Sequence, residues 1–540
     1  MAEPDCDYLI IGAGSAGCVL AEQLSADGRH RVCLLEAGGT DQRWRVQVPI
    51  GYGLSFYDPS LNWMFQTEPQ AALAGRRGYW PRGKVLGGSS AINAMVYIRG
   101  LPQDYDDWRD EGNPGWGWAD VLPHFIALEH FLGAPHPLRG RAGPLQVSDV
   151  SAQLHPLGQA WQRAGQQLGL PVNHGFNGDS AEGIGPYELT MAGGRRMSAA
   201  RAWLRPALRR PNLQVLTDAL ALQVQVEGGR AVGLRYRRGG IEHTMRAARE
   251  VILCAGAVQS PLLLHNSGLG PADVLATLGI PVRQALPAVG RHLQDHLCID
   301  HLYQSRVPTL NQQLRPWWGK LRAGLQYALA RRGPLALSVN QGGGFVRSQP
   351  QAPRPDLQLY FSPLSYTRAP AGQRPLMSPD PFPGFLLSAQ PCRPFSRGQL
   401  RLGAPDGVDR PVIEPNPLAD PRDLALLLQG SRWLRRLAAT PALADVIDAE
   451  LAPGPAVQDD AALEQHIRAQ ASTVFHPCGT CRMGPDAQTA VVDARLRVHG
   501  MAGLRVVDAS VFPSITSGNT NAPTLMVAHR AAQLILEDAR

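Results

Sequence analysis

Short apolar runs that stop at a glycine or at an acidic residue recur along this 540-residue chain, mainly near its two ends. Each run is brief and lacks the polar alternation of a half-buried strand, which is typical of strands buried on both faces of a parallel sheet. The pattern predicts an α/β fold in which helices cover both faces of that sheet. The runs occupy residues 7–11, 31–35, 250–257 and 504–507.

The first run leads into a glycine-rich turn. Gly12 permits a tight turn, Gly14 leaves room for a pyrophosphate beside the backbone, and Gly17 lets the following helix pack against the strand. Glu36 ends the second run, 19 residues after Gly17, where dinucleotide-binding folds place a carboxylate for the ribose hydroxyls. These residues predict a dinucleotide cradle. Taken alone, the glycines also fit an NAD-linked dehydrogenase.

Both ends of the chain are expected in this domain. Residues 213–226 and 231–236 are predicted to form an antiparallel meander that turns at Gly228 and Gly229. The fourth run ends at Asp508 and so repeats the strand-then-acid pattern. A closing helix is predicted over 523–536.

The character of the chain changes between about residues 300 and 470. Loops rich in arginine and proline alternate with polar and aromatic strands such as 356–361, and a helix is predicted over 422–438. This indicates an inserted α+β domain, an antiparallel sheet flanked by helices, with a substrate pocket at its junction with the first domain. The dinucleotide-binding domain is predicted over 1–299, with excursions into the substrate domain near 150–190. Residues 300–470 are predicted to form mainly the substrate-binding domain. Residues 471–540 are predicted to return to the first domain and to carry the catalytic residues.

Composition and charge narrow the functional class. Hydrophobic residues make up 44% of the chain and charged residues 18%, which excludes a disordered or fibrous protein. The net charge is +7, but the basic residues form short doublets rather than a run that could follow a phosphate backbone, so nucleic-acid binding is not expected. The eight scattered cysteines fit a reducing compartment.

No targeting segment is expected. Residues 1–6 lack a basic start, the run after them meets Gly12, and no stretch reaches the roughly 18 apolar residues of a membrane span. The sequence therefore predicts a cytoplasmic protein. Peripheral attachment to the inner membrane stays open, because a basic patch assembled by folding is invisible in a sequence.

Several longer motifs resemble those of the glucose–methanol–choline (GMC) oxidoreductases. The stretch RGKVLGGSSAINAMVYIRG at 82–100 is similar to the first family motif. The second is matched by GAVQSPLLL at 256–264 and SGLGP at 267–271. The C-terminal region is matched by residues 476–484, 508–510 and 518–524. These matches span nearly the whole chain in the family's order, and the choline dehydrogenase and FAD-dependent alcohol dehydrogenase branch is the most similar.

The resemblance implies a Rossmann-like domain that binds FAD. Some relatives carry, just before the asparagine that matches Asn93, a histidine bonded covalently to the flavin; because Ile92 stands there, non-covalent FAD is expected. The positions carried over to the pyrophosphate are Gly12, Gly14, Ser15 and Gly17, and Glu36 is carried over to the adenosine ribose. Those carried over to the flavin are Gly88, Asn93 and Ala94 on one side and Asp508 and Asn519 on the other.

The implied reaction is oxidation of an alcohol to an aldehyde by hydride transfer to flavin N5. Hydride leaves an alcohol carbon readily only while the hydroxyl proton is being removed, so a base must lie beside the flavin. His476 is the candidate, because a neutral imidazole accepts a proton and the family's catalytic histidine falls here. Asn519 would donate a hydrogen bond to the developing alkoxide without titrating. The alternatives are a structural loop histidine and a turn asparagine beside Gly518.

Substrate and electron acceptor are left open by the sequence. Choline and other primary alcohols fit as substrates, and either oxygen or a quinone-like carrier fits as acceptor, so the enzyme is a dehydrogenase or an oxidase. Val474, close to His476, is one candidate for controlling oxygen access. The other hypotheses are a non-redox lyase like the hydroxynitrile lyases, in which FAD is only structural, and a cofactor-binding protein without activity.

Two further groups of residues have competing interpretations. Cys478 and Cys481 form a C-x-x-C pattern that suits a redox dithiol or half a zinc site, but no second pair at ligand spacing exists, so we interpret both as structural and expect no metal. Five aromatic residues could cage a quaternary ammonium or be ordinary core residues. They are Trp317, Trp318, Tyr360, Phe361 and Tyr366.

Overall fold

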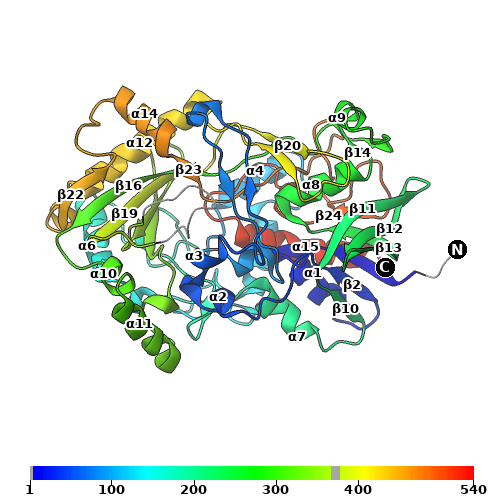
Figure 1. Cartoon of the computed structure of the whole chain (residues 1–540), viewed down its shortest axis with the longest axis horizontal. Helices are drawn as coiled ribbons and strands as arrows, with labels where there is room; N and C mark the ends of the chain where they lie inside the picture. The colour runs from blue at the N-terminus through cyan, green and yellow to red at the C-terminus, as the bar shows by residue number, and fades with distance from the viewer. Residues whose placement is uncertain (1–3, 367–377, 540) are drawn as a thin grey trace.

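The structure is a computed structural model that describes residues 4–366 and 378–539. Figure 1 shows two lobes side by side along the long axis, with both chain ends in the right-hand lobe. Parts of the predicted segments fall at residues 1–3, 367–377 and 540, which lie outside the described residues.

The right-hand lobe is built on a mostly parallel sheet. Its parallel strands run in the order β10, β2, β1, β13, β24. Tyr8 pairs with Val32 across β1 and β2, and Leu9 pairs with Val251 across β1 and β13. The sheet confirms the predicted α/β class and brings both ends of the chain into one domain. The strand bounds are β1 Cys6–Ile11, β2 Val32–Leu35, β10 Leu213–Leu216, β13 Ile241–Leu253 and β24 Leu504–Val506.

An antiparallel meander continues the same sheet beyond strand β13. The first half of β13 pairs with β12 (Arg230–Arg238), which pairs with β11 (Ala219–Glu227). The prediction of one meander strand over 213–226 was wrong, because residues 213–216 form the parallel edge strand β10 instead. Asp218 separates the two strands: its φ of 56° lies in the left-handed region, which a continuous strand does not admit.

Helices from distant parts of the sequence cover this sheet. Helix α15 confirms the predicted closing helix, and it packs against α1 in one continuous core with the strands. The hydroxyl of Ser15 donates to the side-chain oxygen of Asn521 over 2.8 Å, which ties the start of α1 to the start of α15. The bounds are α1 Ser15–Leu24, α8 Gly256–Asn266 and α15 Asn521–Asp538.

The left-hand lobe contains an antiparallel sheet in the order β22, β16, β19, β18, β17, β7. Helix α12 (Pro421–Ala438) confirms the helix predicted over 422–438, and it packs with α6 (Leu157–Gln167) on one face of the sheet. The strand bounds are β7 Gly183–Pro186, β16 Leu297–Ser305, β17 Gly342–Val346, β18 Leu357–Ser362, β19 Gly384–Pro391 and β22 Ile447–Ala452, with β23 Ser472–Thr473 beside β16.

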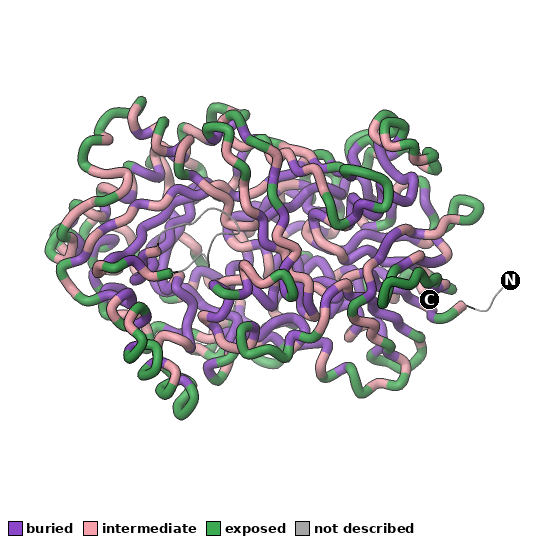
Figure 2. Tube along the Cα trace, viewed as in Figure 1, coloured by how far each residue is buried: buried purple, intermediate pink, exposed green. Residues whose placement is uncertain are grey.

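Alternation along β18 and β19 divides this lobe into a core face and a cavity face. Leu359, Phe361 and Phe385 point into the core under α6 and α12. Their neighbours Tyr360 and Ser362 point to the opposite face, where they line a cavity. Successive side chains of a strand face opposite sides, so one sheet supplies both a packed core and a cavity wall. Figure 2 shows the buried segments gathered along both sheets.

Shorter elements connect the two lobes and cover their surfaces. Among the described residues, no helix is long and apolar enough to cross a bilayer. The remaining helices are α2 Trp44–Gln47, α3 Tyr52–Ser55, α4 Pro102–Asp110, α5 Trp118–Leu128, α7 Arg205–Ala207, α9 Ala272–Thr277, α10 Leu310–Leu314, α11 Trp317–Ala330, α13 Pro441–Ala444 and α14 Asp460–Gln470. Short strands pair as β3 Phe65–Gln66 with β4 Tyr79–Trp80, β5 Glu129–Phe131 with β6 Leu145–Val147, β8 Met191–Ala192 with β9 Arg195–Arg196, β14 Leu269–Gly270 with β15 Gln284–Ala285, and β20 Gln399–Leu402 with β21 Pro411–Glu414.

Candidate active site

A cavity of about 1020 Å³ runs from the glycine turn after β1 to the cavity face of the second sheet. Its size lies at the upper end of the range of roughly 300–1,000 Å³ for ligand pockets. The residues predicted from the sequence that line it are Gly12, Gly14, Ser15, Glu36, Gly88, Asn93, Ala94, His476, Asp508 and Asn519. Gly17 does not line it. One continuous space therefore connects the cradle for a dinucleotide with the candidate catalytic residues.

The glycine turn between β1 and α1 is held by close backbone contacts. Gly12 has a φ of 101°, and a Cβ there would lie 2.6 Å from the backbone oxygen of Cys254. A Cβ at Gly17 would lie 1.9 Å from the backbone oxygen of Gly12, so the first turn of α1 packs directly against the loop. Both glycines are required by the protein's own packing, whatever ligand is bound.

Gly14 differs from these two glycines. A Cβ built on it would meet no protein atom closer than 3.9 Å, and its φ of −76° suits any residue. Gly14 nevertheless lines the cavity at the N-terminal end of α1, where free backbone N–H groups and the helix dipole favour an anion. The open space above Gly14 fits a pyrophosphate.

Glu36 lines the cavity beside the glycine turn. The N–H of Ala13 donates to Oε2 of Glu36 and the N–H of Gly38 donates to Oε1, each over 2.9 Å. Burial raises the pKa of Glu36 to about 7, against the lowering effect of these two N–H donors and of Lys84. Each carboxylate oxygen keeps a lone pair, so the group could accept ribose hydroxyls at the cavity wall.

Asp508 joins the returning C-terminal segment to helix α8. Its Oδ2 accepts from the hydroxyl of Ser260 (2.6 Å) and from the N–H of Gly256 (2.8 Å), and its Oδ1 accepts from the N–H of Ser510 (2.8 Å). Burial raises the pKa of Asp508. These bonds fix Asp508 in the cavity wall and leave its unused lone pairs for a cofactor hydroxyl.

The stretch 82–100 passes close to the glycine turn. A Cβ on Gly88 would lie 2.6 Å from the Cα of Gly14, so the two loops touch through glycine backbones. Asn93 accepts from the buried guanidinium of Arg196 over 2.7 Å, which fixes its amide. Ile92, the position at which some relatives have a flavin-linked histidine, also lines the cavity.

His476 stands at the far end of the cavity within a chain of hydrogen bonds. Its Nδ1 lies 2.9 Å from Nδ1 of His296, and its Nε2 lies 3.2 Å from Nδ2 of Asn519. Nε2 of His296 lies 2.8 Å from the backbone oxygen of Cys392. The imidazole is thus held from both ring nitrogens.

These distances assign the tautomer of His476. A carbonyl oxygen only accepts, so the Nε2 of His296 that faces Cys392 carries the proton, and the Nδ1 of neutral His296 is an acceptor. His476 must then donate from Nδ1. Its Nε2 is then unprotonated and accepts from Nδ2 of Asn519 at the cavity wall, which is the form that accepts a proton from a substrate.

The amide of Asn519 is also oriented by its neighbours. Its Oδ1 accepts from Nε2 of Gln358 over 3.4 Å, which turns its Nδ2 toward His476. Oε1 of Gln358 accepts in turn from the Tyr360 hydroxyl (3.0 Å) and from Nε2 of Gln390 (2.8 Å). An N–H donor and the lone pair of His476 therefore meet at one place.

Electrostatics keep His476 neutral. Burial lowers its pKa well below 6.5, and the nearby His296 and Arg82 act in the same direction. Burial also lowers the pKa of His296 to about 4, so this residue is neutral as the tautomer argument requires. Asp295 accepts from the backbone N–H of His476 over 2.7 Å, and burial raises the pKa of Asp295 to about 6.

Sequence reasoning missed His296, Asp295 and Gln358. A signal existed for the first two, because Asp295 and His296 stand together directly before β16, a strand in the second sheet. Gln358 interrupts the apolar residues of β18. None of these signals points to His476, because the partners lie 180 and 118 residues away from it and only folding brings them together.

Neither of the two interpretations of the five aromatic residues, a cage or core packing, holds for all of them. Trp317 and Trp318 are 76% and 57% exposed on helix α11, and Phe361 lies in the core against Trp161. Tyr360 and Tyr366 line the cavity, as does Val474. Cys478 and Cys481 are free thiols buried in the core of the right-hand lobe, and among residues 4–366 and 378–539 no cluster of metal-ligating side chains occurs.

Comparisons with known proteins identify the family. The N-terminal profile of the GMC oxidoreductases matches residues 6–298, and the C-terminal profile matches residues 394–528. The chain belongs to the GMC oxidoreductases. Both the glycine turn and the loop that carries His476 fall within the matched residues.

Relatives extend the match over the full chain. An alcohol dehydrogenase [acceptor] of Pseudomonas putida is 42% identical over 98% of this chain and 95% of its own length. A mitochondrial choline dehydrogenase of Homo sapiens is 43% identical over 98% of this chain and 89% of its own length. The crystal structure of pyridoxine 4-oxidase from Mesorbium loti superposes with a TM-score of 0.88 at 33% identity, over 98% of this chain and 99% of that one.

The GMC oxidoreductase is therefore an FAD-dependent enzyme, and alcohol oxidation is its reaction class. Its cavity fits the cofactor on grounds that the structure itself supplies. Gly14 leaves an open, anion-favouring space, Glu36 offers acceptors at one end, and the loop from Gly88 to Ala94 borders the space that leads to His476.

We expect Gly14→Ala to fold normally but to bind FAD roughly 10- to 100-fold more weakly, since overpacking a tight contact costs about 1–3 kcal/mol. The added methyl group would lie no closer than 3.9 Å to any protein atom, so the expected loss comes from its contact with the cofactor. The measurement is the FAD recovered in solution after acid precipitation, together with the melting temperature of the apoprotein. Gly158→Ala, at an equally open position in α6, is the control and should keep its FAD. An unchanged FAD content in Gly14→Ala would contradict this placement.

His296→Phe should slow flavin reduction by roughly 10- to 100-fold, the usual cost of losing a residue that orients a ligand or base. Phenylalanine keeps the ring but cannot accept from His476, which is then free to turn its protonated nitrogen to the cavity. The substrate dissociation constant in stopped-flow reduction should barely change. His301→Phe is the matched control, because His301 is a buried histidine five residues further on, in β16, and it does not line the cavity. Equal losses in both variants would show a merely structural role.

Proposed function

We propose that this GMC oxidoreductase oxidises a primary alcohol to the aldehyde, with His476 as the base that removes the hydroxyl proton. The single observation that carries the proposal is the basic lone pair on Nε2 of His476, which His296 fixes on the cavity side and which accepts from the amide N–H of Asn519. Bound FAD supplies the oxidised ring that takes up the hydride.

His476 and Asn519 have different roles at the hydroxyl group of the substrate. A substrate oxygen within hydrogen-bond reach of both side chains replaces the bond between them: it gives its proton to Nε2 of His476 and accepts a hydrogen bond from Nδ2 of Asn519. The amide stabilises the negative charge that develops on oxygen, and it stays neutral throughout. Proton removal leaves the lone pair on oxygen to form the C=O bond as the C–H bond breaks, which balances the oxidation.

The positions carried over to FAD keep their assigned roles in this proposal. Gly12, Gly14, Ser15 and the first turn of α1 border the pyrophosphate, with Gly17 acting through the packing of that turn. Glu36 holds the adenosine ribose, while Gly88, Asn93, Ala94 and Asp508 border the flavin half of the cofactor. With Ile92 in the cavity wall, the flavin is bound without a covalent link, so acid precipitation releases all of it.

The substrate is proposed to be choline or another primary alcohol, since the relatives include a choline dehydrogenase and an alcohol dehydrogenase. The acceptor that reoxidises the flavin is a quinone-like carrier or oxygen. Stopped-flow reduction across a panel of alcohols, followed by reoxidation with a soluble quinone or with oxygen, ranks the substrates and separates dehydrogenase from oxidase.

We expect His476→Ala to keep its yellow FAD but to be reduced by alcohol roughly 10²- to 10⁴-fold more slowly, the usual contribution of a general base. The measurement is anaerobic single-turnover bleaching of the flavin. His243→Ala, an exposed histidine on β13, is the control. Unchanged bleaching in His476→Ala would refute the assignment, and a wild-type enzyme that no alcohol bleaches would indicate the lyase.

The pH profile of kcat/KM should stay flat down through pH 6.5. The reaction needs neutral His476, and burial lowers the pKa of His476 well below 6.5, so protonation removes activity only at lower pH. Arg82→Met removes a neighbouring cation, which raises the pKa of His476 and should move the acid limb to higher pH. A wild-type acid limb above pH 6.5 would show that this histidine is charged at neutral pH.

A further inference from the structure

Helix α11 turns its leucine and tryptophan side chains toward solvent, which is unusual for a helix at the surface of a protein. The residues that it buries are Gly319, Ala323 and Tyr327, each four positions after the last, and they pack against the protein. Its large apolar residues face solvent, with Leu329 85% and Trp317 76% exposed. A helix of a globular protein normally turns its apolar stripe inward.

The exposed apolar residues form one continuous ridge. Trp318, Leu321, Leu325 and Leu329 follow one another at spacings of three and four residues, which places them on a single side of the helix. Trp317 extends the ridge at the N-terminal end. Figure 1 shows α11 projecting from the lower left of the molecule, and Figure 2 shows most of its length exposed. An exposed ridge of this size marks a contact surface.

All charges on and beside the ridge are positive. The sequence contains no aspartate or glutamate between Asp300 and Asp356. Within the described parts of the chain, no carboxylate lies within ion-pair distance of the five cations that lie in or flank α11; the ion pair nearest in sequence joins Arg306 to Asp448. The five exposed cations are Arg315, Lys320, Arg322, Arg331 and Arg332.

We propose that α11 is an in-plane anchor that seats this enzyme on an anionic bilayer surface. A ridge of tryptophan and leucine flanked only by Lys and Arg matches a helix that buries its apolar side at the level of the lipid headgroups. Anionic headgroups attract the unpaired cations. A second copy of the chain is disfavoured as occupant, because a twofold contact would bring ten like charges together.

The anchor is close to the active-site cavity. Ala323 on the buried side of α11 belongs to the same core cluster as Tyr52 and Val339, and these two residues line the cavity. A bilayer seated on the ridge therefore lies on the outer side of one cavity wall. The surface proposal rests on the exposure and charge of α11 alone, and it stands whether or not His476 is the base.

The test is co-sedimentation of the holoenzyme with vesicles of phosphatidylcholine alone and of equal parts phosphatidylcholine and phosphatidylglycerol. Binding to the mixed vesicles should be at least about tenfold stronger and should fall as salt screens the charges. Tryptophan fluorescence should shift to the blue on binding. Leu325→Gln with Leu329→Gln should lower binding at least about tenfold, because both leucines lose their contact with the acyl chains.

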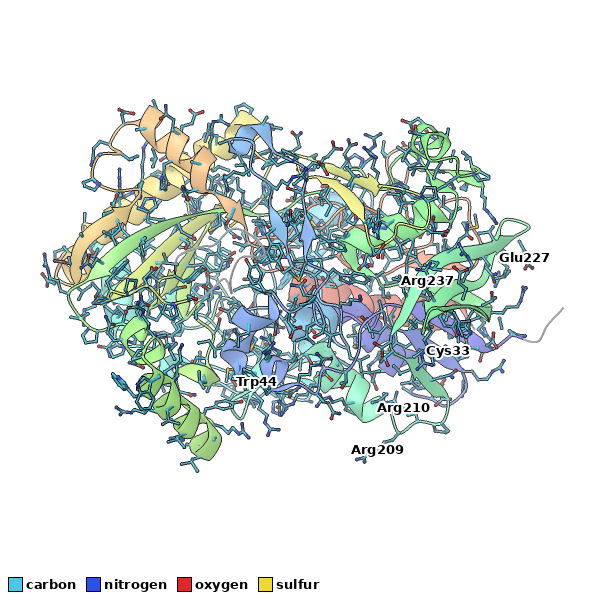
Figure 3. All side chains as sticks on the ribbon, viewed as in Figure 1. Cys33, Trp44, Arg209, Arg210, Glu227 and Arg237 are labelled. Atoms are coloured by element: carbon cyan, nitrogen blue, oxygen red, sulfur yellow. The ribbon has the colours of Figure 1, made fainter. Side chains whose placement is uncertain are left out.

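Matched variants separate the apolar from the charged contribution. Arg322→Gln with Arg332→Gln should abolish most of the preference for anionic over neutral vesicles. The controls are Ile241→Gln and Arg209→Gln, exposed positions outside α11, of which Arg209 points into solvent in Figure 3. All variants should retain FAD and alcohol-dependent flavin reduction in solution. Absence of binding to both vesicles at low salt, or a dimer in light scattering that Leu325→Gln dissociates, would overturn the proposal.

Discussion

Strand β24 contributes three residue pairs to the parallel sheet beside β13, and this short contact brings the end of the chain to its beginning. Asp508 lies two residues after the end of β24 and accepts from Gly256 and Ser260 of α8. The chain then continues to Asn519 beside His476, and to Asn521, which bonds to Ser15 at the start of α1. The dinucleotide cradle and the candidate base are therefore assembled by one strand that returns to the sheet.

Desolvation sets the chemistry inside the cavity. It raises the pKa values of Glu36 and Asp295 and lowers that of His476, so each group is shifted toward its neutral form. A neutral imidazole could donate or accept from either nitrogen. The backbone oxygen of Cys392 removes that freedom through His296, because a carbonyl can only accept. Burial keeps His476 neutral, and the hydrogen-bond chain determines which of its two ring nitrogens accepts a proton.

The two lobes have different tasks. The parallel sheet positions backbone N–H groups and carboxylates for the cofactor. The antiparallel sheet presents alternate residues of β18 and β19 to the cavity, and His296 lies directly before its strand β16. Helix α11 belongs to this second lobe. Its small buried residues pack against the protein, while its leucines and tryptophans face solvent.

The sequence by itself determined what depends on near neighbours. Apolar runs with glycine at Gly12 and Gly17 specify a strand, a turn and a close-packed helix, because those contacts lie within a few residues. The proposal of His476 and Asn519 as catalytic residues came from resemblance to a family rather than from physics. The split at Asp218 shows the limit of local reasoning, since an apolar stretch does not reveal where its pairing partner changes.

Only the tertiary structure decided the tautomer of His476, because its determinants, His296 and the carbonyl of Cys392, lie 180 and 84 residues away in sequence. The same holds for exposure. Tyr360 and Phe361 are neighbours that face opposite sides of one strand. Trp318 faces solvent although tryptophan is a large apolar residue that suits a protein core. Burial is a property of what packs around a residue, and that is set by contacts between segments far apart in the chain.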